Sequence, residues 1–273
     1  MSEPRPLPAT LDLDAYAPAQ IAERVERAGV AKARLPVVQT LALAVLAGAF
    51  IAFGGMLYLV AMTEPALGLG PSRLLGGVAF SLGLILVSIA GAELFTGNAL
   101  MVMALVDGRI AAAELVRNWT IVLFGNAIGG VGAALLYHWA EGTGLGGGKV
   151  AATLAAVARA KVTMTWDVAF VRGVLCNALV CLAVWLSLAA RDIAGRILAI
   201  VFPITAFVAL GFEHSIANLF TLPLALLEGV DGVDPSGVLH NLVWVTAGNV
   251  VGGAGLVGLV YWVCYRMQRE PAG

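Results

Sequence analysis

Charged residues are scarce in this sequence, and their scarcity excludes most classes of protein. Only 12% of the 273 residues are Asp, Glu, Lys or Arg, whereas 60% are hydrophobic. An average soluble protein has about a quarter of its residues charged. The formal net charge is −1 and there is no long run of Lys or Arg, so we expect no nucleic-acid-binding surface. The composition indicates a single domain whose solvent is lipid.

Cysteine and histidine are also rare, at three residues each, and neither has the spacing of a metal or haem site. Cys176, Cys181 and Cys264 all lie in apolar segments, without a C-x-x-C pair. We therefore expect buried, unreactive thiols, no metal, no cofactor and no enzymatic activity. The glycine-rich residues 142–149 lack the Ser or Thr that a phosphate-binding G-x-x-x-x-G-K-[ST] loop requires at its end.

Long uncharged segments predict six membrane-spanning helices. A hydrocarbon core of about 30 Å is crossed by a helix of about 20 residues, and four plain segments are long enough. These segments are residues 35–63, 118–140, 173–190 and 235–265. Two further stretches, 74–106 and 197–227, are too long for one ordinary crossing, and a glutamate interrupts each of them. We interpret both as broken helices whose unwound backbone faces the protein interior.

The basic residues are divided unequally between the two sides of this predicted bundle. Eleven lie on the side that holds both termini and five lie on the other. The positive-inside rule therefore predicts cytoplasmic termini and a multi-pass protein of the plasma (inner) membrane. We expect a cytoplasmic N-terminal segment at 1–34, with a short amphipathic helix at 18–33, a channel domain at 35–266 and a cytoplasmic tail at 267–273.

The most informative motif is G-x-E-x-x-x-x-N, which occurs once in each broken stretch, at residues 91–98 and 211–218. A second pattern, G-N-x-x-G-G, also occurs twice, at 125–130 and 248–253. Spans one to three therefore resemble spans four to six. This predicts an all-α membrane protein of two inverted three-helix repeats, in which helices two and five are broken and meet at a central site. The residues that mark the breaks are Gly91, Glu93 and Asn98, and Gly211, Glu213 and Asn218.

His214 stands out because the repeat does not require it: the equivalent position in the first half is Leu94. A histidine beside a carboxylate at a helix break can exchange a proton near neutral pH, so we assign it a transport function. We interpret Glu93 and Glu213 mainly as structural residues that hold unwound backbone in place or cap a half-helix N-terminus. Both remain candidate pore residues.

Together these residues resemble the formate/nitrite transporter family, and the resemblance covers nearly the whole chain. It is carried by residues 94–98 (LFTGN), 118–119 (NW), 173–187 around Asn177, and 211–218 (GFEHSIAN). The resemblance implies an aquaporin-like protomer in a homopentamer, with one pore in each subunit. It also implies that His214 is the central pore histidine, that Thr96 lies on the loop in the broken second helix, and that Asn177 and Lys161 are polar partners near the histidine.

The same resemblance implies two apolar constrictions. The residues of the inner constriction would be Phe80, Leu84 and Phe207. The residues of the outer constriction would be Leu94, Phe95 and Val180. Arg172 departs from this interpretation, because it places a charge five residues before Asn177. We expect its side chain either to extend outward to the membrane surface or to alter the outer vestibule.

The expected cargo is a small monovalent anion of a weak acid, carried with a proton. Formate is the leading candidate and nitrite the second, while hydrosulfide, acetate and lactate remain open. A neutral-solute channel of aquaporin type is less favoured, because it would carry paired Asn-Pro-Ala turns at the breaks, and the sequence has none. The expected partners are these anions, protons, the lipid bilayer and further copies of the chain.

Overall fold

The computed structural model describes residues 14–64 and 66–267, and every regular element in them is a helix. Six apolar helical segments are long enough to cross a membrane, which confirms the prediction of an all-α fold with six membrane-spanning helices. They are Val37–Ala61, Leu69–Gly91, Ala112–Trp139, Trp166–Ala189, Ile193–Leu210 and Pro235–Tyr265. Of the expected terminal segments, residues 1–13 and 268–273 lie outside the described part of the chain.

Several spans consist of more than one element, and shorter helices lie between the spans. The elements of the first half are α1 (Pro18–Ala33), α2 (Val37–Ala61), α3 (Leu69–Phe80), α4 (Leu82–Leu86), the π-helical η1 (Val87–Gly91), α5 (Phe95–Asn98), the 3-10 helix η2 (Ala99–Met101), α6 (Val102–Val106) and α7 (Ala112–Trp139). Those of the second half are the 3-10 helix η3 (Gly142–Gly144), α8 (Lys149–Val162), α9 (Trp166–Ala189), α10 (Ile193–Leu210), α11 (Ser215–Leu227), α12 (Pro235–Val250), the π-helical η4 (Val251–Leu259) and α13 (Val260–Tyr265).

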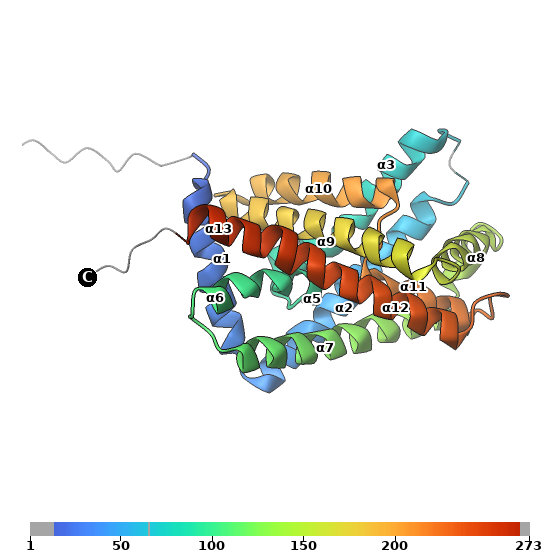
Figure 1. Cartoon of the computed structure of the whole chain (residues 1–273). Helices are drawn as coiled ribbons and strands as arrows, with labels where there is room; N and C mark the ends of the chain where they lie inside the picture. Colours follow the sequence, from blue (N-terminus) through green and yellow to red (C-terminus); the bar gives the residue numbers. More distant parts are fainter. Residues whose placement is uncertain (1–13, 65, 268–273) are drawn as a thin grey trace, which may run out of the picture.

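The two short amphipathic helices mark the two ends of the bundle (Figure 1). Helix α1 crosses one end, where it contacts α6 and α13, and α8 lies at the opposite end. Both ends of the described chain lie at the α1 end. We call the α1 end the terminal side and the α8 end the distal side.

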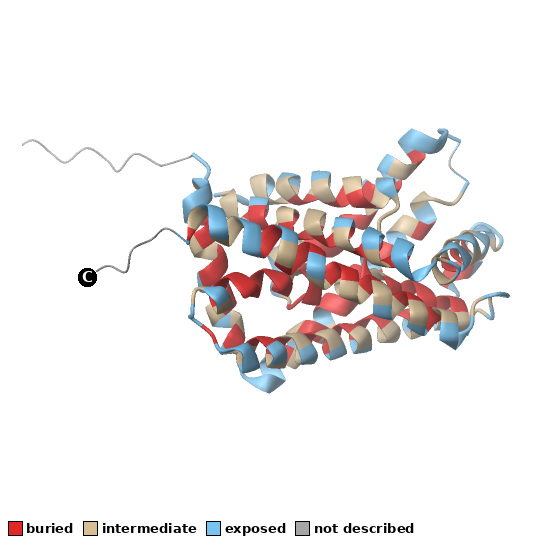
Figure 2. Cartoon of the chain, viewed as in Figure 1, coloured by how far each residue is buried: buried red, intermediate tan, exposed pale blue. Residues whose placement is uncertain are grey.

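Burial follows the inward faces of the spans (Figure 2). One apolar cluster occupies the centre of the bundle, between α2, α3, α9 and α10, and includes Ile51, Phe80 and Phe207. Large apolar side chains on the outward faces, such as Phe124 and Phe202, are exposed. An apolar outer surface of this kind suits contact with lipid or with neighbouring subunits.

Both long stretches are interrupted, as the repeated motif predicts. The first runs through η1 to Gly91, becomes extended at residue 92, and resumes as a helix at Phe95. The second stops at Leu210 and resumes at Ser215. The motif glycines make these breaks possible, since Gly91 and Gly211 have φ of 88° and 75°, which side-chain-bearing residues rarely adopt.

Asn126 on α7 binds the unwound backbone of the first break. Its Oδ1 accepts from the Phe95 N–H at 2.9 Å, and its Nδ2 donates to Glu93 O at 2.9 Å and to Ala44 O at 2.8 Å. Because lipid offers no hydrogen bonds, backbone that leaves a helix at membrane depth needs such a partner. The side chain of Asn126 therefore connects the break to α2 and α7.

Asn249 on α12 makes the same three contacts in the second half. Its Oδ1 accepts from the Ser215 N–H at 2.9 Å, and its Nδ2 donates to Glu213 O at 3.0 Å and Gly173 O at 2.8 Å. The two asparagines are those of the repeated G-N-x-x-G-G pattern. The pattern thus supplies one partner for each break.

The glycines of that pattern allow two pairs of helices to pack closely. A Cβ atom placed on Gly129 of α7 would lie 2.0 Å from Val45 O of α2, and one on Gly252 of η4 would lie 2.0 Å from Val174 O of α9. Backbone this close leaves no space for even a methyl group. These contacts hold α2 against α7 and α9 against the last span.

Gly129→Ala is therefore expected to lower the thermal unfolding midpoint of the purified protein strongly, because α2 and α7 must separate. Gly132→Ala, on the same helix, is a matched control, since a Cβ there meets nothing within 4 Å. The control should leave the midpoint unchanged or raise it, because alanine stabilises a helix by about 0.5–1 kcal/mol relative to glycine. Equal midpoints for the two variants would show that the close contact is unimportant.

A buried ion-pair cluster fastens α1 to the end of the chain. Glu26 is fully buried, and Arg266 contacts both of its carboxylate oxygens at 2.8 Å. Arg266 also lies 3.4 Å from Asp107, which follows α6. Burial raises the pKa of Glu26 above its ordinary value, although its arginine partner acts in the opposite direction. Helix α1 is thus docked on the protein through this cluster.

Candidate functional site

His214 lies in the break between α10 and α11, and its side chain is buried at the centre of the molecule. Its Nδ1 accepts a hydrogen bond from the Ala217 N–H at 3.2 Å and caps α11. Its Nε2 lies 2.9 Å from Thr96 Oγ1 in α5. Since Nδ1 is an acceptor, the neutral ring carries its proton on Nε2 and donates it to Thr96. The two broken stretches meet at this hydrogen bond.

Asn177 contacts the backbone of Thr96 rather than the histidine. Its Nδ2 donates to Thr96 O at 3.2 Å and to Asn249 O at 2.6 Å. Cys181 Sγ also lies 3.4 Å from Thr96 O. The Oδ1 atom of Asn177 is buried and has no hydrogen-bond partner among the described residues. The sequence placed Asn177 near the histidine, and the structure connects the two through Thr96.

Lys161, Glu213, Asn218 and Asn241 form a closed network on the distal side. Lys161 Nζ contacts the two carboxylate oxygens of Glu213 at 2.9 and 2.8 Å. Asn218 Nδ2 donates to Glu213 at 2.7 Å and to Asn241 Oδ1 at 2.7 Å. Asn241 Nδ2 then donates to Lys161 O at 2.9 Å. Glu213 therefore has a cation and an amide as partners.

An equivalent network lies on the terminal side. Lys32 Nζ contacts Glu93 Oε1 at 2.6 Å, and Asn98 Nδ2 donates to Glu93 Oε2 at 2.7 Å. Asn98 also donates to Asn118 Oδ1 at 2.9 Å, and Asn118 donates to Lys32 O at 3.4 Å. Each end of the molecule thus has a Lys, a Glu and two Asn in the same order of contacts.

Lys32 is a functional candidate that the sequence analysis missed. It lies near the end of α1, as Lys161 lies near the end of α8, and each of these helices precedes the first span of its half. Comparing the segments before the two first spans would have paired the two lysines. The repeat therefore includes an amphipathic helix as well as three spans.

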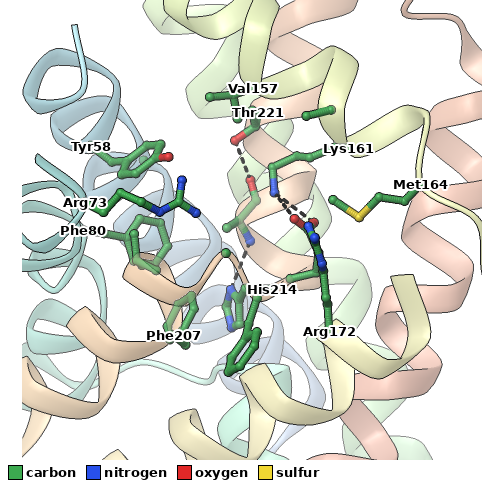
Figure 3. Close-up of a pocket in the computed structure, with 17 residues that line it drawn as sticks. Tyr58, Arg73, Phe80, Val157, Lys161, Met164, Arg172, Phe207, His214 and Thr221 are labelled. Carbon is green, nitrogen blue, oxygen red and sulfur yellow. Dashed lines mark hydrogen bonds and ion pairs between the residues drawn. The ribbon is translucent and has the colours of Figure 1, made fainter. Parts of the chain in front are cut away.

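A cavity of about 180 Å³ opens beside the histidine on the distal side (Figure 3). We call it the distal vestibule. Its polar lining residues are Arg73, Lys161, Arg172, Glu213, His214, Tyr58 and Thr221. Arg172 therefore lines the vestibule, so of the two expected positions for its side chain the structure shows the vestibular one.

A second cavity, of about 520 Å³, lies on the terminal side. We call it the terminal vestibule. It is lined by the ion pair of Lys32 and Glu93, by Arg196, and by apolar side chains that include Leu84 and Leu94. Both vestibules therefore combine a lysine–glutamate pair with at least one arginine.

Buried apolar side chains separate the two vestibules. All six residues expected at the constrictions belong to the central apolar cluster, and they are Phe80, Leu84, Leu94, Phe95, Val180 and Phe207. The ring centroid of Phe207 lies 5.7 Å from that of Phe80 and 5.9 Å from that of His214. An ion entering this cluster loses its water without gaining a partner.

The expected sides of three constriction residues were wrong. Phe80 and Phe207 line the distal vestibule, although they were expected on the inner side with the termini. Leu94 was expected on the outer side, and it lines the terminal vestibule. The direction of the chain explains the difference: the second span starts on the distal side and runs toward Gly91 on the terminal side, so its early residues lie near the distal vestibule.

The cysteines differ from expectation at one position. Cys176 and Cys181 are buried, as predicted, whereas Cys264 on α13 is exposed. No group of three or more His, Cys, Asp or Glu residues in the described ranges is arranged to hold a metal ion. The site chemistry of these residues is that of hydrogen bonds, ion pairs and one imidazole.

Comparison with known proteins connects this arrangement to a family. The model of the formate/nitrite transporter family matches residues 19–263. The chain belongs to this family. The match includes both breaks and nearly all of the amphipathic helices and the six spans.

Relatives of this transporter match over most of their length. The formate channel FocA of Escherichia coli (strain K12) is 38% identical over 94% of this chain and 97% of its own. A probable formate transporter of Methanothermobacter thermautotrophicus is 42% identical over 91% of this chain and 96% of its own. The solved structure of a pentameric formate channel with formate bound has a TM-score of 0.78 and 36% identity, over 84% of this chain and 97% of that one.

Proposed function

We propose that this transporter carries formate across the membrane, and that the ion crosses the central apolar cluster as neutral formic acid. One observation carries the proposal: a single imidazole, hydrogen-bonded to Thr96 at 2.9 Å, stands at the centre, with a cation-lined vestibule on each side. The relatives named for formate support the choice of substrate. Nitrite, another weak-acid anion, is the second candidate because the family description includes it.

Energetics favour the neutral route. A bare ion moved from water into a medium of low dielectric constant costs on the order of 20 kcal/mol in the idealised Born estimate. The pKa of a simple carboxylic acid is about 4, about three units below pH 7, so protonating the carboxylate at that pH costs roughly 4 kcal/mol. This cost is far smaller than that of moving the bare ion, so the neutral route is favoured. The rings of Phe80 and Phe207 then act as a barrier to ions and let the neutral acid pass.

His214 supplies the proton in this scheme. The vestibules concentrate the anion, since Arg73 and Arg172 in the distal vestibule and Arg196 in the terminal vestibule add positive charge beyond the two lysine–glutamate pairs. At the centre, the ring first takes a second proton from water in either vestibule, and Nε2 then gives its proton to the carboxylate oxygen, which leaves the ring neutral again. Thr96 accepts from the same nitrogen and keeps it directed across the pore.

We also propose where the molecule sits and how it assembles. The terminal side faces the cytoplasm, because nine of the fourteen Lys and Arg residues in the described ranges lie on it, and the chain lies in the plasma (inner) membrane. The exposed apolar faces of the spans suit a homopentamer in lipid, with one pore in each protomer. The pentameric relative supports this assembly.

A flux comparison in proteoliposomes tests the proposed function. Formate, nitrite and chloride are supplied separately at pH 6, 7 and 8, and entry is followed by stopped-flow light scattering. We expect formate flux to rise as the pH falls and chloride flux to stay at the level of empty liposomes, because chloride cannot be neutralised by a proton. Equal fluxes of chloride and formate would favour a plain anion channel instead.

A further inference from the structure

Arg73 on α3 is fixed at the mouth of the distal vestibule. Its Nε donates to Ala209 O at 2.6 Å, at the end of α10, where backbone carbonyls have no helical partner. A Cβ atom on Gly211 would lie 2.8 Å from Arg73 Nη2, so this glycine provides the space that the guanidinium occupies. The rest of the guanidinium, with its remaining N–H donors, lines the vestibule.

Arg172 on α9 lies on the opposite side of the same cavity, together with Lys161 (Figure 3). Its side chain makes no hydrogen bond or ion pair with any residue in the ranges 14–64 and 66–267. The only carboxylate that lines the vestibule, that of Glu213, contacts Lys161 at 2.8 Å and not Arg172. The positive charges of both arginines therefore remain without a counterion in the described structure.

Arg73 also connects the vestibule to the outside. A surface groove of about 550 Å³ between α2, α3 and α8 shares Tyr58, Arg73, Val157 and Ala160 with the vestibule. The groove contains Lys149 as well, but Glu64 lies 2.7 Å away and neutralises it. An anion that enters along the groove therefore meets Arg73 as the first uncompensated cation.

We propose that Arg73 and Arg172 form a loading site in the distal vestibule that binds a small carboxylate in its ionised form before it receives a proton. A guanidinium is well suited to this because it presents paired N–H donors to the two oxygens of a carboxylate. The inference rests on the proposed function and adds a substrate-binding step to it. Lys161 is excluded from this role because it is already paired with Glu213.

The loading site makes the two entrances unequal. The distal vestibule has three basic side chains and one carboxylate, whereas the terminal vestibule has two basic side chains, Lys32 and Arg196, and one carboxylate, Glu93. The distal side therefore has one more uncompensated positive charge. We expect formate to reach half-maximal flux at a lower concentration when it enters from the distal side than from the terminal side.

Arg172→Gln and Arg73→Gln are tested in proteoliposomes of known orientation, with formate added to one side at a time. Each variant is expected to raise the half-saturating formate concentration from the distal side by about three- to tenfold and to leave the terminal-side value unchanged. Because the fluxes at low formate must stay equal in the two directions, the maximal distal rate rises by the same factor. Raising the ionic strength to about 0.5 M should remove most of the difference, because exposed charges are then screened. Arg159→Gln is the control, since Arg159 is basic, lies on α8 and lines neither vestibule.

Unchanged half-saturation in Arg172→Gln, or an equal shift in Arg159→Gln, overturns the loading site. If Arg73→Gln fails to fold, the result for Arg172→Gln decides the test, because of the two arginines only Arg73 makes a hydrogen bond to the end of α10. The proposed function fails in a different way, through a wild-type formate flux that does not depend on pH. A pH-dependent flux with unaltered half-saturation in Arg172→Gln would retain the proposed function and remove only this site.

Discussion

His214→Phe is expected to reduce formate flux at pH 7 by about two orders of magnitude, the lower range for losing a positioned proton donor. The phenyl ring fills the space of the imidazole but has no nitrogen to exchange a proton or to contact Thr96. Formate must then take a proton in bulk water and cross as the rare neutral acid. The measurement is initial uptake by proteoliposomes between pH 5 and 8.

The remaining flux in this variant should follow the concentration of formic acid alone and increase about tenfold for each unit that the pH falls. His240→Phe is the matched control, because His240 lies in the second turn of α12 and lines neither vestibule. It should keep both the rate and the pH profile of the wild type. A His214→Phe variant with the wild-type profile would show that the proton does not come from this residue.

Asn249→Leu and Asn126→Leu are expected to abolish the folded protein. Each asparagine bonds two backbone groups of a helix break and one carbonyl of a neighbouring helix, and leucine bonds none of them. A buried polar group that loses its partner costs about 1–3 kcal/mol, so the two groups of the break together cost about 2–6 kcal/mol. Net stabilities of folded proteins are only about 5–15 kcal/mol, and a loss of this size is therefore decisive.

Size-exclusion chromatography in detergent and the thermal unfolding midpoint measure this effect. Thr120→Val is the control on α7, because Thr120 is exposed and bonds only within its own helix, to Val116 O. We expect the control to elute and unfold as the wild type, whereas both leucine variants aggregate or unfold at much lower temperature. Two leucine variants that behave like Thr120→Val would mean that other groups support the breaks.

The positions of the spans and of the breaks could be predicted from the sequence, because the lipid solvent determines which residues can occupy each of them. Lipid excludes charges and unpaired backbone, so uncharged runs and interrupted ones are visible in the residues themselves. The repeated motif at 91–98 and 211–218 then located the breaks. The partner of His214 was not predicted, because the resemblance implied Asn177 and Lys161 near it, whereas Thr96 Oγ1 lies 2.9 Å from its Nε2.

Other features depend on three-dimensional position, and the sequence analysis missed them. Lys32 was overlooked because the repeat was compared only within the spans, yet it contacts Glu93 at 2.6 Å. The resemblance implied Phe80 and Phe207 on the inner side, whereas both line the distal vestibule in the structure. The environment of Arg172 could not be predicted, since its cavity is formed by six different helices and the segments between them.

Electroneutrality is the most direct test of the central claim that the cargo crosses as a neutral acid. Formate uptake is measured in proteoliposomes with potassium gradients and valinomycin setting the membrane potential, while a dye inside reports pH. We predict one proton entering with each formate and the same final accumulation at every potential. If a bare anion crosses, accumulation changes with potential by about 2.3 kcal/mol per 100 mV and the internal pH stays constant, and this result would contradict the account.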